Sequence, residues 1–138
     1  MVKRSLAGDH VWAFDVRDGA GVSRLRREVT SFLRRHAHYV DHAASELILG
    51  ELLGNVVKHT PGFAEVCVAC GGGQNRLLVT DRGPGFVPTR SLPADPLDEN
   101  GRGMFLVHAL SRDVAIRAMP DGGTQVAVEL PLKVAIPA

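Results

Sequence analysis

The segment DHAASELILGELLGNVVKHT, residues 41–60, is apolar over most of a helix circumference and carries one narrow polar strip. Asp41 is a suitable N-cap, and the sequence TPG that begins at Thr60 ends the periodic pattern. We therefore expect a helix that is capped by Asp41 and runs to about His59.

The polar strip of this helix consists of Glu51, Asn55, Lys58 and His59, which follow one another at offsets of four, seven and eight residues from the first. These offsets place the four side chains on one face. The plain interpretation is the solvent-exposed side of an amphipathic helix. The alternative is a functional pair, because Asn is not favoured in mid-helix and Glu51 brings a carboxylate close to the amide oxygen of Asn55. Such oxygens suit a base and a magnesium ligand.

The segments on either side of this helix show strand and helix patterns. Before it, HVWAFDVR (residues 10–17) has the two-residue rhythm of a strand, and Ser23 is a suitable N-cap for a helix to about His36. After it, the predicted elements are strands at 64–70 and 76–81 joined by GGGQN, a helix at 101–112, and strands at 114–119 and 124–132. This order favours an α+β fold, a two-layer α/β sandwich whose helices cover one face of a mixed, mostly antiparallel sheet.

The chain has the size and composition of one domain. With 138 residues, of which 45% are hydrophobic, it can bury about two-thirds of its unfolded surface, and we expect a single domain over residues 1–138. Lys and Arg number 16 against 15 Asp and Glu, so the net charge of +1 gives no reason to expect direct binding to nucleic acid or to a membrane. The N-terminal residues contain no long apolar run, so we expect no secretory signal, no membrane anchor and a cytoplasmic location.

Basic residues cluster locally in RLRREVTSFLRR, residues 24–35. We interpret this cluster as the solvent-exposed side of the predicted helix. A surface that binds a partner is the alternative.

Two groups of residues resemble metal or redox sites, but we interpret them otherwise. Cys67 and Cys70 form a C-x-x-C pattern, yet an offset of three along a strand puts the two thiols on opposite faces, so we expect small core residues. His36, His38 and His42 straddle a predicted helix junction with no fourth ligand spaced nearby, so we expect solvated side chains.

The stretch TDRGPGFVP, residues 80–88, ends a predicted strand at Asp81 and then places two glycines around a proline. A tight turn explains these residues, since Gly tolerates positive φ and Pro presets φ. The alternative is a site for a flat, hydrogen-bonding ligand that the Asp81 carboxylate holds beside closely approachable backbone. Thr124, at the start of a later strand, could assist through its hydroxyl if the two strands are neighbours.

Several prolines interrupt the chain after this stretch, so residues 85–100 form a loop of uncommon length, which is typical of functional or disordered segments. The sequence GRG at 101–103 lies where a helix is expected to begin. The amides of Gly101 and Gly103 could therefore face an anion such as a phosphate. An ordinary helix start is the alternative. The glycine patterns of P-loop and Rossmann proteins do not occur.

These signals occur in one order: Glu51-x-x-x-Asn55, Asp81-x-Gly83-x-Gly85, Gly101-x-Gly103 and Gly123-Thr124. This order resembles the N, G1, G2 and G3 boxes of the GHKL ATPase superfamily, over about residues 46–128. The resemblance implies the Bergerat, or histidine-kinase-like ATPase, fold. It also implies that Asp81 accepts a hydrogen bond from the adenine amino group of ATP. Val56 and Met104 depart from the commoner residues of the boxes without removing a ligand group.

Within the superfamily, GELLGNVVKHT and GRGMFLVHAL resemble the N and G2 segments of the bacterial anti-sigma factor serine/threonine kinases. This resemblance implies that Glu51 is the general base and that Asn55 coordinates Mg²⁺. Gly101 and Gly103 would contact the phosphates beneath an ATP lid at about residues 85–100. The implied reaction transfers the γ-phosphate of ATP to a Ser or Thr of an anti-sigma antagonist.

By the same resemblance, the residues expected to bind the nucleotide are Asn55, Lys58, His59, Asp81, Gly83, Gly85, Phe86, Gly101, Arg102, Gly103, Met104 and Thr124. The implied partners are a sigma factor, a STAS-type antagonist as substrate, and a second copy of the chain. The apolar strand from Val11 to Val16 could form the interface of that homodimer, since an exposed edge strand is otherwise a liability. A nucleotide-binding anti-sigma module without catalysis and a detached histidine-kinase catalytic domain are the alternative functions.

Overall fold

The computed structural model describes residues 2–4, 9–60, 62–71, 73–81, 99–120 and 122–133. In chain order its elements are β1 (Val2–Arg4), β2 (His10–Asp15), α1 (Gly19–His36), α2 (His42–His59), β3 (Phe63–Gly71), β4 (Gln74–Asp81), α3 (Glu99–Leu110), β5 (Asp113–Ala118) and β6 (Thr124–Glu129). Within these ranges, no helix combines the length and the apolar character needed to cross a membrane.

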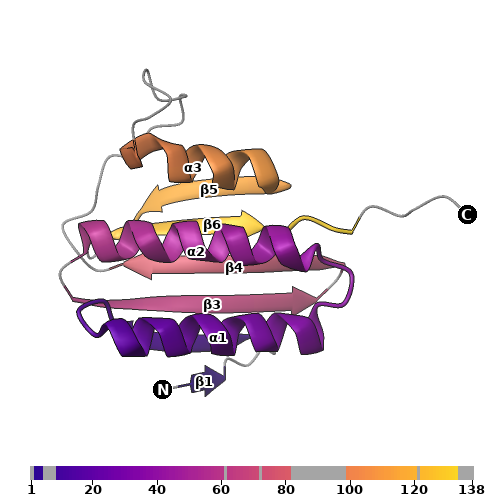
Figure 1. Ribbon diagram of the computed structural model, residues 1–138, viewed down its shortest axis with the longest axis horizontal. Coiled ribbons are helices and arrows are strands. Elements are labelled where there is room, and N and C mark those ends of the chain that lie inside the picture. Colours follow the sequence, from indigo (N-terminus) through magenta and orange to yellow (C-terminus); the bar gives the residue numbers. More distant parts are fainter. Residues whose placement is uncertain are drawn as a thin grey trace, which may run out of the picture.

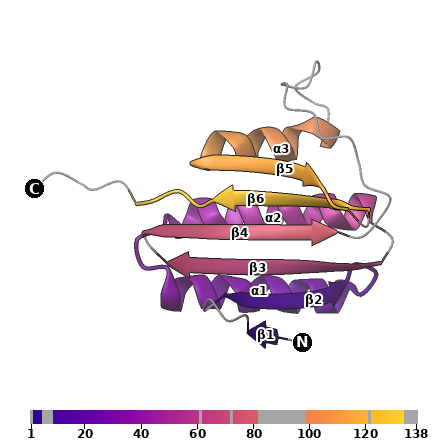
Figure 2. The same cartoon turned by 180° about the vertical axis from the view of Figure 1, so that it is seen from behind.

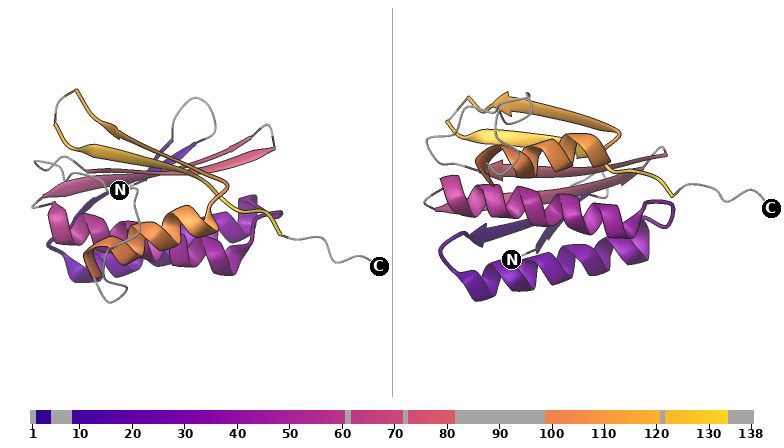
Figure 3. Two further views of the ribbon diagram at one scale, coloured as in Figure 1. Left: turned by 90° about the horizontal axis from the view of Figure 1, so that it is seen from above. Right: turned by 45° about the horizontal axis from the view of Figure 1, so that its top comes forward.

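The elements form two layers, a sheet and a row of helices that covers one of its faces (Figure 1). The strand order is β1-β2-β3-β4-β6-β5, and each neighbouring pair of described strands is antiparallel. Figure 2 shows that no drawn helix covers the opposite face of the sheet, and Figure 3 shows the two layers from above. The predicted α+β sandwich with helices on one face is confirmed, and the described part of the sheet is antiparallel throughout.

The start of α1 differs from the prediction. The helix is capped by Asp18, whose Oδ1 accepts a hydrogen bond from the backbone N–H of Gly21 at 3.0 Å, and Ser23 lies inside the helix on its exposed side. The expectation that Ser23 is the N-cap was therefore wrong. Asp and Ser are both good caps, and the two glycines before Ser23 are poor helix formers that concealed the first turn.

The helix α2 follows its prediction closely. Asp41 is the N-cap, and its Oδ1 accepts a hydrogen bond from the Ala44 N–H at 3.1 Å. The helix ends at His59, where the Thr60 N–H still donates to the carbonyl of Val56 at 2.9 Å. The side of α2 that faces the sheet buries Ser45, Ile48, Leu49, Leu52, Leu53 and Val56.

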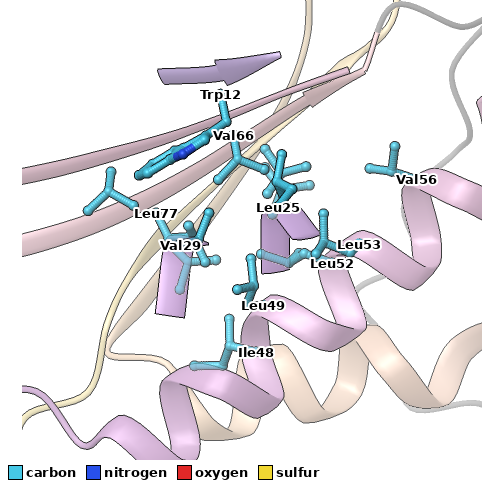
Figure 4. Packing of buried hydrophobic residues seen from close by; sticks show 14 of the residues in the cluster. Trp12, Leu25, Val29, Ile48, Leu49, Leu52, Leu53, Val56, Val66 and Leu77 are labelled. Carbon is cyan, nitrogen blue, oxygen red and sulfur yellow. The ribbon is translucent and has the colours of Figure 1, made fainter. Parts of the chain in front are cut away.

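The core lies between the two layers. Alternate strand residues point toward the helices and are buried, among them Trp12 and Phe14 of β2, Val66 and Val68 of β3, Leu77 and Val79 of β4, and Val126 and Val128 of β6. The close-up in Figure 4 shows Trp12, Val66 and Leu77 from the sheet above Val29 and Leu49 from the helices. This alternation has the period of two that a sheet covered on one side requires.

The strand β2 is covered on its outer side over only part of its length. β1 pairs with it in the register Val2↔Trp12 to Arg4↔His10, whereas, among the described residues, residues 13–15 of β2 pair with β3 alone. The homodimer through the strand from Val11 to Val16 stays a prediction.

The cysteines and histidines do not form a metal site within the part of the chain that the structure describes. Both thiols are free, and Cys70 packs against the core cluster, whereas Cys67 lies between the buried Val66 and Val68 and so faces the other side of β3. Burial raises the pKa of the Cys67 thiol to about 11. The predicted opposite faces are confirmed. The expectation of core packing holds for Cys70 and was wrong for Cys67, because the face of β3 that carries Cys67 is not the one that the helices cover.

The cap of α1 can be tested by a pair of matched substitutions. Asp18→Ala removes the acceptor for the Gly21 N–H and should lower the free energy of unfolding by about 0.5–2 kcal/mol. Ser23→Ala, in the exposed helix interior, should change it by no more than about 0.5 kcal/mol. Urea unfolding of both variants measures the difference, and a larger loss for Ser23→Ala would contradict the observed cap.

Candidate functional site

The four polar residues of α2 stay on one side of the helix, opposite the buried side. Glu51, Asn55 and His59 are half-buried, whereas Lys58 is exposed. Half-burial of polar side chains on a helix that is otherwise packed indicates that a neighbouring element lies over the strip. That element is α3, which packs on α2.

The contact between α2 and α3 places Glu51 directly against Gly103. A Cβ atom built on Gly103 would lie 2.5 Å from Oε2 of Glu51, closer than real Cβ contacts allow. Only glycine therefore lets the backbone of α3 approach this carboxylate without moving it. The sequence singled out both residues, but it did not predict that they touch.

The start of α3 also differs from the prediction. The helix begins at Glu99, two residues before Gly101, so the last two residues of the predicted lid belong to α3. In an α-helix the N–H of the fifth residue is paired with the carbonyl of the first, which makes the Gly103 amide part of the helix itself. The Gly101 amide remains among the unpaired first N–H groups of the helix. That Gly101 and Gly103 contact phosphates stays a prediction, and the small size of Gly103 allows close approach at its Cα.

The other predicted residues of this segment divide into two groups. Met104 is only 5% exposed and belongs to the hydrophobic core cluster, so the structure places it in the packing of α3. Arg102 lies in the first turn of α3. Gly83, Gly85 and Phe86, and the predicted lid up to residue 98, lie outside the described residues.

The second half of the site is a buried carboxylate at the end of β4. Asp81 is 3% exposed, and its Oδ1 accepts a hydrogen bond from the backbone N–H of Thr124 at 3.3 Å. This contact arises because β4 and β6 are neighbours, in a register that pairs Thr80 with Gln125. The expectation that the two strands lie side by side is confirmed.

The chain reaches Thr124 through a tight turn. Gly122 and Gly123 have φ values of +91° and +86°, a left-handed conformation that favours glycine. Thr124 itself is 5% exposed. The hydrogen bond to Asp81 comes from the backbone of Thr124, and the role of its hydroxyl toward a ligand stays a prediction.

Burial gives the Asp81 carboxylate a definite chemical character. A carboxylate removed from water is costly unless N–H or O–H donors satisfy it, and the Thr124 amide supplies one donor. Such a group is an acceptor of fixed position in a poorly hydrated environment. It suits a planar ligand that offers an amino group.

Asn55 has the character expected of a ligand-binding amide. Its Nδ2 atom is buried and has no hydrogen-bond partner among the described residues. A buried amide group normally has its partners, so this position calls for one from outside the described chain. Rotation of the Asn55 amide would place Oδ1 at the position of Nδ2. Because Mg²⁺ prefers oxygen ligands, the residue fits a magnesium ion that also binds phosphate.

A comparison with known families identifies the domain. The sequence model of one family, the histidine kinase-like ATPase domain, matches residues 17–130 of this chain, which include α2, Asp81, Gly103 and Thr124. The chain belongs to the histidine kinase-like ATPase family. Membership of this family implies ATP binding. The structure supplies two groups on which such binding could rest, the half-buried Asn55 and the buried Asp81.

A curated relative of this ATPase domain is the sensor protein kinase CarS of Pseudomonas aeruginosa. It is 36% identical over 98 residues, which cover 62% of this chain and 22% of CarS. The chain thus spans about a fifth of the length of that relative.

The contact between Glu51 and Gly103 can be tested by a double-mutant cycle. Gly103→Ala must displace the Glu51 carboxylate, whereas Glu51→Ala/Gly103→Ala leaves only the Cβ of residue 51, at an ordinary 3.9 Å. The carboxylate is the far end of a flexible side chain and can move aside at low cost, so we expect a coupling free energy of only about 0.5 kcal/mol between the two substitutions, measured by urea unfolding. The control is Gly54→Ala at an exposed position of α2, where an added Cβ meets nothing and should stabilise the protein by about 0.5–1 kcal/mol. A coupling of several kcal/mol would contradict a carboxylate that can move aside.

Proposed function

We propose that this ATPase domain is a serine/threonine protein kinase that also binds a sigma factor as an anti-sigma factor and phosphorylates an anti-sigma factor antagonist. The observation that carries the proposal is the position of Glu51, one helical turn from Asn55 and against the backbone of α3 at Gly103. A carboxylate, an amide and a helix N-terminus are thereby brought to the same side of α2. This set of groups suits phosphoryl transfer, where catalysis is mainly positioning and charge stabilisation.

In the proposed reaction Glu51 accepts the proton of a Ser or Thr hydroxyl of the substrate protein. The hydroxyl oxygen forms a bond to the γ-phosphorus of ATP, the bond from that phosphorus to the β–γ bridging oxygen breaks, and ADP leaves. Asp81 holds the adenine amino group, and Gly101 and Arg102 in the first turn of α3 lie near the phosphates. Asn55 would hold Mg²⁺, which neutralises phosphate charge when bound.

The proposed partners follow from the resemblance to the anti-sigma kinases. A STAS-type antagonist is the substrate, and phosphorylation adds about −1.5 to −2 charges at its contact with the kinase, which would weaken their complex. A sigma factor and a second copy of the chain are the other proposed partners.

The similarity to a sensor protein kinase supports a second candidate function, that of a detached catalytic domain that phosphorylates a histidine of another protein. The two functions differ in the chemistry of the product, because phosphoserine and phosphothreonine survive acid whereas phosphohistidine is hydrolysed. An acid wash of the labelled product therefore separates them.

The test is transfer of labelled phosphate from ATP to purified STAS-type antagonists, with wild type, Glu51→Gln and Glu46→Gln compared. Loss of a general base should lower the rate about 10²–10⁴-fold and leave ATP binding intact. Glu46→Gln is the matched control on the same helix, since Glu46 pairs with Arg34 of α1, away from the strip.

Three outcomes would contradict the proposal. Unaltered transfer by Glu51→Gln would overturn the role of Glu51. An acid-labile product would favour histidine phosphorylation. ATP binding with sigma-factor binding, but without transfer to any antagonist, would favour the non-catalytic anti-sigma module.

A further inference from the structure

A cleft of about 580 Å³ lies between α1 and the β2 side of the sheet. We name it the arginine cleft and define it by His10 and Trp12 of β2 and by Arg24, Arg27, Phe32, Arg35 and His36 of α1. It is separate from the candidate nucleotide site, because β3 lies between β2 and β4 in the sheet. Figure 1 shows α1 and α3 on opposite sides of α2.

The wall of the arginine cleft is a row of cations on one helix face. Arg24, Arg27 and Arg35 line the cleft, and their offsets of three and eleven residues from the first place them on the same side of α1. None of the three forms an ion pair with another residue in the described ranges. The other arginines of α1 are engaged elsewhere: Arg34 pairs with Glu46, and Arg26 lies against Gly50 of α2.

The floor of the arginine cleft is a set of aromatic rings in contact with one another. The Phe32 ring lies 4.1 Å from that of His10 and 4.4 Å from that of His36, measured between centroids, and Trp12 meets Phe32 edge-on at 5.5 Å. Trp12 and Phe32 are core residues, which holds the floor in place, whereas His36 is exposed. A rigid aromatic floor suits an apolar side chain that is inserted between the arginines.

Two further residues of the same helix face distinguish a peptide from a polyphosphate chain. Glu28 and Ser31 line the cleft between Arg27 and Arg35. The Glu28 carboxylate disfavours any anion placed directly beside it, but it can accept the backbone N–H groups of a peptide, which a polyphosphate chain does not offer. The arginines beside it can bind carboxylate side chains in the bidentate manner for which guanidinium is suited.

We propose that the arginine cleft is a docking site for an acidic peptide segment of a partner protein. The carboxylates of the segment bind Arg24, Arg27 and Arg35, and one apolar side chain of the segment packs on the ring floor. This surface is independent of nucleotide binding and does not rest on the kinase reaction.

Trp12 provides a direct reporter, since it is the only tryptophan of the chain and lines the cleft. The probe is a blocked peptide of about ten residues with four glutamates around one leucine. A second peptide carries glutamine in place of each glutamate. Trp12 fluorescence and calorimetry measure binding to the full chain, and we expect binding of the acidic peptide alone, weakened by added salt.

The matched variants carry the same change in net charge. Arg24→Gln/Arg27→Gln removes two cations from the cleft, and Arg34→Gln/Arg112→Gln removes two exposed cations outside it. We expect the first variant to bind the acidic peptide at least about tenfold more weakly than wild type, and the second to stay within about twofold. Unfolding midpoints of both variants verify that each is folded.

Several results would overturn the proposal. Equal losses in the two variants would show a response to net charge alone. Tighter binding of single-stranded DNA or of phosphatidylserine vesicles through Arg24 and Arg27 would assign the cleft to polyanions. Failure of the acidic peptide to bind wild type at about 1 mM would exclude a peptide site of useful affinity.

Discussion

The packing of α2 against the sheet is the constraint on which the rest of the structure depends. Its buried residues, from Ile48 to Val56, fill the layer between the helices and strands β3 and β4, so the helix cannot turn about its axis without losing this contact. One residue of rotation would move every side chain by about 100°. Because close-packed cores resist such a change, Glu51 and Asn55 are held half-buried beneath α3.

The other fixed point is the antiparallel pairing of β4 with β6, which brings the Thr124 amide to the Asp81 carboxylate. The helical and the sheet parts of the candidate site thus come from segments far apart in the chain. The approach of α3 to α2 at Gly103 brings the backbone of α3 to the carboxylate of Glu51. Membership of the histidine kinase-like ATPase family implies that the domain binds ATP, while the outer, arginine-rich side of α1 belongs to neither part of the candidate site.

Local patterns predicted most of the fold and singled out the residues proposed for the site. The alternation around Val66 and the Asp41 cap are properties of single segments, and both are confirmed. The helix start at Asp18 was missed because two suitable cap residues lie close together and glycines weaken the signal between them. The contact of Glu51 with Gly103, like the hydrogen bond from the Thr124 backbone to Asp81, depends on how distant segments approach, and no local period encodes it.

The central claim is that the buried carboxylate of Asp81 selects adenine, and thermal unfolding with nucleotides tests it most directly. Asp81→Asn keeps an oxygen that can accept the Thr124 N–H but loses the charge, so the fold should survive the change. With Mg²⁺ present, ATP at about a hundred times its dissociation constant should add about 2.7 kcal/mol of stability to wild type. GTP should add far less, because guanine presents a carbonyl where adenine presents an amino group, and Asp81→Asn should lose the response to ATP. An equal response to GTP, or an ATP response that survives in Asp81→Asn, would contradict the account.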